Sequence, residues 1–101
     1  MSTVEYSAQF LDGTVFFSIE EVVRVTGLSA GELAELAERG VLHHTGGGQY
    51  TAQVVSLGRR AARLRDAFEL DIAGLALTIS LLERIEALEI RLRALDSQLP
   101  R

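Results

Sequence analysis

Residues 18–42 read SIEEVVRVTGLSAGELAELAERGVL, and this stretch decides the fold. It carries the same signal twice, a serine followed three residues later by a glutamate: Ser18 with Glu21, and Ser29 with Glu32. In such a capping box each side chain satisfies a free backbone amide at the start of a helix. We therefore predict that two helices begin within 25 residues of each other in this stretch.

The two predicted helices are short and are separated by a glycine. The first follows Ser18 and ends at Gly27, and the second spans about Ala30–Arg39 and ends at Gly40, because glycine readily adopts the conformation that terminates a helix. Two short helices joined by a glycine-containing turn make a helix-turn-helix unit. The apolar positions expected to face the core are Ile19, Val22, Val23, Leu33, Leu36 and Ala37.

The segments on either side of this unit have different patterns. Val4–Phe10 and Thr14–Phe17 are β-prone, and Asp12–Gly13 between them suits a tight turn, so a small N-terminal β-hairpin is predicted. Residues 43–50, centred on three consecutive glycines, have no apolar period. They indicate a mobile loop or the tip of a wing, with Tyr50 anchoring its far end.

Two more helices are predicted in the second half of the chain. Thr51 is the candidate N-cap of the first and Asp71 of the second, which Pro100 closes. Ile72–Leu82 is apolar almost all round but reaches only about half of the roughly 20 residues that a membrane-spanning helix needs, so we expect it at the centre of the fold. The apolar stripe of the third helix, expected to face the core, is Val54, Leu57, Ala61, Leu64 and Phe68.

The last helix carries a second apolar stripe with the spacing of a coiled coil. In that register Arg84 and Arg91 flank one side, and Glu89 and Asp96 the other. Opposite charges meet in a parallel dimer and like charges in an antiparallel one, although exposed pairs contribute only a few tenths of a kcal/mol each. We predict a homodimer, with folding of the stripe onto its own domain as the alternative. The stripe consists of Leu81, Ile85, Leu88, Leu92, Leu95 and Leu99.

Length and composition fit one small domain of the mainly all-α class. The chain has 101 residues, which we divide into a helix-turn-helix region with its hairpin and wing-like loop, residues 1–70, and a core helix continuing into a short coiled coil, residues 71–101. Residues 1–6 lack the features of a secretory signal, and no apolar run is long enough for a membrane span. We therefore expect a cytoplasmic protein.

Several kinds of chemistry are absent from the sequence. There is no cysteine, which excludes disulfides and thiolate chemistry. His43 and His44 have no further metal ligand at a suitable spacing, and the three glycines lack the lysine and hydroxyl residue of a phosphate-binding loop. No nucleophile with a positioned base is recognisable. We expect no metal, no cofactor and no enzymatic activity.

Charge is distributed unevenly along the chain. The formal net charge is −4, with ten basic residues, all arginine, against fourteen acidic ones. The second predicted helix offers Glu32, Glu35 and Glu38 against Arg39, a surface that repels phosphates, whereas a DNA-reading helix must attract them. Such a face suits a basic protein surface better, and argues against nucleic-acid binding by this chain alone. Four arginines could contact DNA or pair with acids of the same chain: Arg59, Arg60, Arg63 and Arg65.

Three motifs in the second half carry a resemblance to a known family. They are RRAARLRD at 59–66, LDIAGLAL at 70–77 and LLERI at 81–85, and they follow the Ser18–Leu42 region described above. In this order they resemble the CbpM family of chaperone modulators, which is built on a MerR-like helix-turn-helix. The resemblance implies binding to the J domain of a CbpA-type DnaJ homologue, with inhibition of its stimulation of a DnaK-type ATPase and of its DNA association. A small dimeric MerR-type regulator that binds operator DNA is the alternative.

The resemblance and the charge pattern together suggest residue roles. Arg63, Leu64, Asp71 and Gly74 match the motifs and are interpreted as fold determinants, with Asp71 as a cap and Gly74 allowing close helix packing. The hairpin region and the glycine-rich loop are longer than the family pattern. The acids that we predict to contact the J domain are Glu20, Glu21, Glu32, Glu35 and Glu38, extended by Asp66, Glu69 and Asp71.

Overall fold

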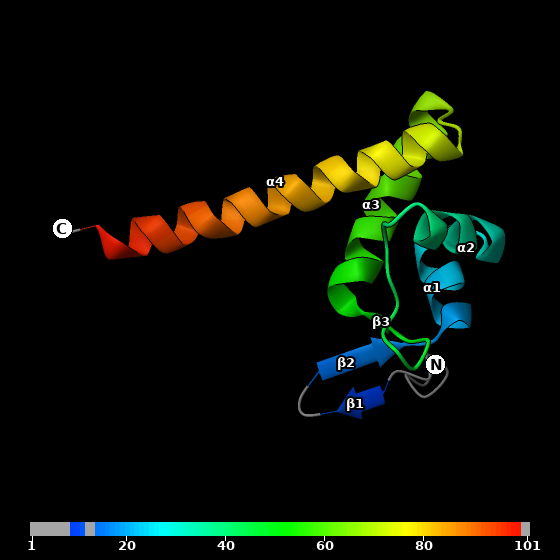
Figure 1. Ribbon diagram of the computed structural model, residues 1–101, viewed down its shortest axis with the longest axis horizontal. Helices are drawn as coiled ribbons and strands as arrows, with labels where there is room; N and C mark the ends of the chain where they lie inside the picture. Colours follow the sequence, from blue (N-terminus) through cyan, green and yellow to red (C-terminus); the bar gives the residue numbers. More distant parts are fainter. Residues whose placement is uncertain (1–8, 12–13, 100–101) are drawn as a thin grey trace.

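The computed structural model describes residues 9–11 and 14–99, and its helices dominate the fold, as predicted (Figure 1). The predictions for residues 1–8, for the Asp12–Gly13 turn and for Pro100 lie outside the described residues. The elements in chain order are β1 (Gln9–Leu11), β2 (Thr14–Phe17), α1 (Ile19–Thr26), α2 (Ala30–Glu38), β3 (Tyr50–Thr51), α3 (Ala52–Phe68) and α4 (Ile72–Gln98).

Both predicted capping boxes are present at the starts of α1 and α2. The Ser18 N–H donates to Glu21 Oε1 at 2.9 Å and Ser18 Oγ accepts from the Glu21 N–H at 3.3 Å. The Ser29–Glu32 pair repeats this with distances of 2.9 and 3.0 Å. α1 ends at Gly27, whose φ of 87° is left-handed. Local sequence therefore fixes where both helices of the helix-turn-helix begin.

The turn between α1 and α2 is buried beneath α3. Leu28 is fully buried in it, and Thr26 Oγ1 both donates to the Val22 carbonyl at 2.6 Å and accepts from the Leu28 N–H at 3.0 Å. On α3, a Cβ at Gly58 would lie 3.3 Å from side-chain carbons of both Leu28 and Thr26. Gly58 therefore allows α3 to approach the turn closely.

Gly74 has a different environment. Its N–H donates to Asp71 Oδ1 at 2.8 Å, which confirms Asp71 as the N-cap of α4. A Cβ at Gly74 would meet Asp71 and Leu70, the residues of its own capping turn. The predicted role of Gly74 in helix–helix packing is therefore wrong.

The N-terminal hairpin is confirmed and gains a third strand. β1 pairs with β2 antiparallel, and β2 pairs on its other side with β3, where Phe17 lies opposite Tyr50. Tyr50 is buried, so it anchors the end of the 43–50 loop as predicted. Within that loop the Thr45 N–H donates to the Gln49 carbonyl at 2.7 Å, which closes a tight turn.

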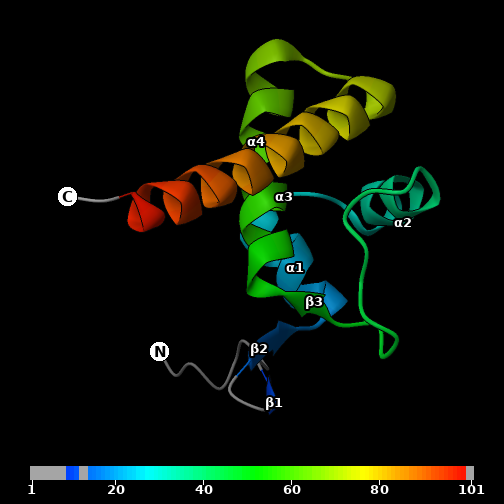
Figure 2. The same cartoon turned by 60° about the vertical axis from the view of Figure 1, so that its left-hand side comes forward.

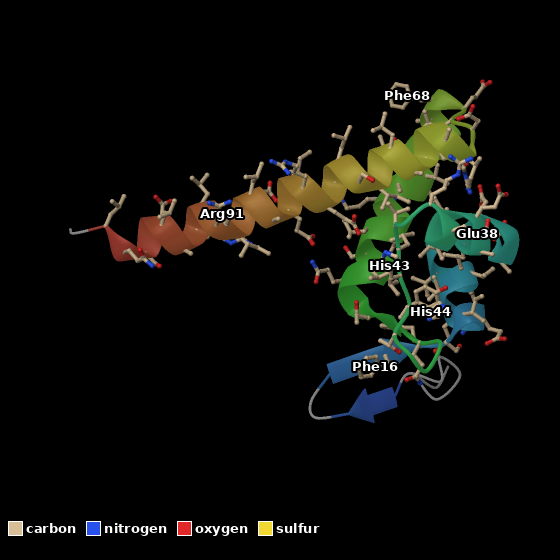
Figure 3. The ribbon with its side chains drawn as sticks, viewed as in Figure 1. Phe16, Glu38, His43, His44, Phe68 and Arg91 are labelled. Carbon is tan, nitrogen blue, oxygen red and sulfur yellow. The ribbon has the colours of Figure 1, made fainter. Side chains whose placement is uncertain are left out.

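α3 begins at its predicted cap, Thr51, whose Oγ1 accepts from the Val54 N–H. Most of its predicted stripe packs into the core, but Phe68 is 70% exposed, so that part of the prediction is wrong. Figure 3 shows why: Phe68 lies at the corner where α3 ends, beyond the region covered by α1 and α2. Val55 and Ala62 are buried instead.

α4 contributes one face to the core and then leaves the domain. Its buried side chains are Leu75, Ala76, Ile79 and Leu82. Figures 1 and 2 show the remainder of the helix extending alone to the C-terminal end. Ile72–Leu82 is thus buried on one side only, rather than all round, and Leu77 on its other side is 61% exposed.

The close approach at Gly58 predicts a stability effect. Gly58→Val should lower the free energy of unfolding by about 1–3 kcal/mol, because the added atoms displace Leu28 and Thr26. Gly31→Ala in α2 is the matched control, since its Cβ meets only Ser29 Oγ at 3.8 Å. Urea denaturation would measure both variants. Equal stability of Gly58→Val and the unmodified protein would contradict this account of the turn.

Candidate functional site

Arg65 ties α3 to the turn of the helix-turn-helix. Its Nη1 lies 2.6 Å from Glu32 Oε1, its Nη2 donates to the Gly27 carbonyl at 3.2 Å, and its Nε donates to Asp66 Oδ1 at 3.0 Å. The hydrogen bond that Arg65 donates to Asp66 is the largest influence raising the pKa of Arg65, with Glu32 adding to it against the effect of burial. The guanidinium thus stays charged and joins residues 33 positions apart.

Several of the acids predicted to contact a J domain make contacts within their own chain instead. Glu21 is 1% exposed, and its Oε2 has no hydrogen-bond partner among the described residues. The prediction that Glu21 contacts another protein is therefore wrong, because the capping box turns its side chain into the core. Glu32 and Asp66 are paired with Arg65, and Asp71 caps α4.

Glu35 and Glu38 of α2 form what we call the acidic surface. α2 buries Leu33 and Leu36, so Glu35 and Glu38 turn outward, and both are exposed. Figure 3 shows Glu38 at the outer edge of the molecule. No arginine of the described residues lies within ion-pair distance of either carboxylate. Two further predicted acids, Glu20 on α1 and Glu69 after α3, are also exposed.

The arginines of α3 are only partly neutralised within the chain. Arg65 is paired as expected, but Arg59, Arg60 and Arg63 are exposed, and the described part of the chain places no acid within ion-pair distance of them. Of the two roles expected for these arginines, intramolecular pairing is therefore found for Arg65 and, among the described residues, not for the other three. Their positions along the helix put them on the side of α3 that faces away from the core.

The histidines of the 43–50 loop contact backbone atoms. His43 Nε2 is 2.9 Å from the Gly40 carbonyl, and His44 Nδ1 is 2.6 Å from the Thr45 carbonyl. The His44 ring meets Tyr50 edge-on, with 5.8 Å between ring centroids. Within residues 9–11 and 14–99, no group of three or more His, Asp or Glu is placed to hold a metal ion.

The predicted coiled-coil residues are exposed, and we call them the exposed stripe. The alternative that the stripe folds back onto its own domain is wrong, since these side chains are 47–63% exposed. Ile90 is also exposed but falls outside this spacing. In the described residues no helix has the length and apolar character of a membrane span. The exposed stripe comprises Leu81, Ile85, Leu88, Leu92, Leu95 and Leu99.

Comparison with known proteins agrees with this architecture. Residues 17–97 match the family of MerR HTH regulatory proteins. The chaperone modulatory protein CbpM of Citrobacter koseri is 35% identical over 92 residues, which cover 87% of this chain and 91% of that protein. The chain belongs to the CbpM family. The resemblance seen in the sequence motifs is thus confirmed, and the family match includes the helix-turn-helix together with nearly all of α4.

Sequence reasoning predicted that Arg65 could pair with an acid of the same chain, but not that it holds the turn of the helix-turn-helix. Its pairing with Asp66 could be expected from their adjacency, but its contacts with Glu32 and Gly27 join distant segments. No pattern of neighbouring residues in the sequence predicts such contacts. Of the motif-matched fold determinants, Arg63 is exposed, and its neighbour Leu64 packs against the core.

The two neighbouring arginines allow a controlled test. Arg65→Gln should reduce the free energy of unfolding by about 1–2 kcal/mol, because it leaves partly buried charged and polar groups unpaired. Arg63→Gln removes the same charge from an exposed position and should change stability by less than about 0.5 kcal/mol. Chemical denaturation measures both. Equal effects would show that Arg65 does not hold the turn.

Proposed function

We propose that this protein is a non-enzymatic chaperone modulator that binds the J domain of a CbpA-type DnaJ homologue. Binding would inhibit the stimulation of a DnaK-type ATPase by that homologue and its association with DNA. The proposal places this activity in the cytoplasm and needs no cofactor. Family membership supports the general role, and the observation that carries the specific one is the exposed acidic surface on α2.

The position of the acidic surface supports a protein partner over DNA. In a DNA-binding helix-turn-helix the second helix enters the major groove, close to phosphates. Here that helix is α2, and Glu35 and Glu38 point outward from it without a cation to neutralise them among the described residues. A basic protein surface gains from this arrangement, because complementary potentials speed encounter and exclude wrong partners. The basic helix surface with which J domains engage their DnaK partner has the required sign.

One observation favours the alternative of a DNA-binding regulator. Arg59, Arg60 and Arg63 present three charges on the outward side of α3. They lie on α3 rather than on α2, so a duplex read by α2 would meet carboxylates first. DNA binding through these arginines would weaken steeply with added salt as counterions are displaced.

We also propose that the protein is a homodimer joined through the exposed stripe. The stripe continues a helix whose first turns are packed into the core, so the helix does not have to nucleate on its own. A contiguous apolar strip on a small protein marks a contact surface. Heptad spacing is the pattern with which a second helix packs.

The acidic surface gives the test of J-domain binding. Glu35→Arg combined with Glu38→Arg should lower the capture of a purified CbpA-type protein at least about tenfold, by converting attraction into repulsion. Glu83→Arg combined with Glu86→Arg makes the same change in charge on α4 and should leave capture within about twofold. Circular dichroism melting checks that all variants are folded.

Two outcomes would reverse the proposal. Undiminished capture by the Glu35/Glu38 variant would remove the acidic surface from the interaction. Salt-sensitive shifting of an operator duplex, without any J-domain capture by the unmodified protein, would favour the transcription regulator.

If the exposed stripe joins two chains, a charge placed in it should halve the molecular mass of the protein in solution. Leu92→Asp should convert the dimer into a monomer in light scattering, because it places a charge in the apolar seam. Ile90→Asp makes the same change two residues away, outside the seam, and should leave the dimer intact. A monomeric unmodified protein at micromolar concentration would contradict the proposed homodimer.

A further inference from the structure

Three arginines lie together on the side of α3 that faces away from the core. Arg59, Arg60 and Arg63 fall within about 100° of the helix circumference, and we call them the cationic patch. All three are exposed, and no ion pair among the described residues includes any of them. Like charges three and four residues apart destabilise a helix. The chain therefore carries a repulsive cluster that an anionic partner would relieve.

The cationic patch and the acidic surface lie on different sides of the domain. A Cβ at Gly58 would point toward Leu28 and Thr26, in the turn of the helix-turn-helix. At about 100° per residue, Arg63 lies roughly 140° and Arg60 roughly 160° around α3 from Gly58. The patch thus faces away from the turn that leads into α2, and Figures 1 and 2 both show α2 to one side of α3. A partner bound to the acidic surface therefore leaves the cationic patch open.

We propose that the cationic patch is a second docking surface, which takes an acidic segment of a protein. An arginine binds a carboxylate through two parallel hydrogen bonds, because its planar guanidinium matches the two oxygens. Arg63 follows Arg59 by four residues and Arg60 by three. Carboxylates that repeat every three or four residues along a helix have the same spacing. The fitting occupant is an acidic helix of about two turns.

The size of the cationic patch favours such a segment over a nucleic acid. Arg59 and Arg63 are separated by roughly 6 Å along the helix axis. Asp66, whose side chain is 72% exposed, follows them on α3, and Glu86 lies beside the start of α3, where it accepts a hydrogen bond from Gln53 at 2.5 Å. A long duplex would extend past the patch and meet these carboxylates, which repel phosphates. A two-turn acidic segment covers the arginines alone.

A second docking surface goes beyond the proposed function and does not depend on J-domain binding. The acidic surface attracts a basic partner and the cationic patch an acidic one, so complementary charge directs different occupants to them. The protein can then hold a J domain and an acidic segment at the same time. Such a molecule joins two partners in addition to blocking one of them.

Titration with a synthetic peptide tests the cationic patch. The probe is an alanine-based helical peptide with glutamates three and four residues apart, and the control peptide has glutamine at the same positions. In NMR titrations at low ionic strength, only the glutamate peptide should shift the backbone amide signals of α3. Arg59→Gln combined with Arg63→Gln should raise the Kd at least about fivefold. Arg91→Gln combined with Arg93→Gln removes the same charge from exposed positions on α4 and should change the Kd by less than about twofold.

Four results would overturn the inference. The glutamate peptide might shift no signal of α3, or the two double variants might weaken binding equally, which would mean that affinity follows net charge. Loss of J-domain capture by the Arg59/Arg63 variant would show that these arginines belong to the J-domain site. A DNA duplex that binds through them, and that the glutamate peptide does not displace, would make a nucleic acid the occupant. Circular dichroism melting checks that both double variants are folded. Because the titration uses only the protein and the peptide, its failure is distinct from a failure of J-domain capture.

Discussion

The guanidinium of Arg65 is the contact on which the arrangement of the helices depends. It bonds to Glu32 at the start of α2, to the carbonyl of Gly27 in the turn, and to Asp66 on its own helix. Close approach of α3 at Gly58 brings the helices near enough for this contact. α4 follows α3 in the chain, and the burial of its Leu75, Ile79 and Leu82 in the same core sets where the exposed stripe leaves the domain.

This contact determines which charges remain for a partner. Glu32 and Asp66 are paired with Arg65, so the acidic face anticipated from sequence shrinks to its outer members, Glu35 and Glu38. The same pairing removes one cation from α3 and leaves the other three outward. The protein therefore presents an acidic surface on α2, exposed arginines on α3 and an apolar stripe on α4. Each helix is thus suited to a different kind of contact.

Local interactions were predictable from sequence, and those between distant segments were not. The Ser18 and Ser29 capping boxes and the Asp71 cap follow from residues three apart, and the exposed stripe follows from its spacing. Exposure of Phe68 and pairing of Tyr50 with β2 depend on where other elements end. Burial of Glu21 was missed because a glutamate on a helix is ordinarily solvated. The candidate site was thus predicted as a region, with some of its members misassigned.

The turn between α1 and α2 has a further consequence for recognition. Thr26 both donates and accepts a hydrogen bond there, and Leu28 is fully enclosed, so the angle between the two helices is set before any partner arrives. Association through α2 would then lose little backbone conformational entropy. The conformational cost of binding would then fall mainly on side chains, and the shape of the surface would select among partners as a rigid template.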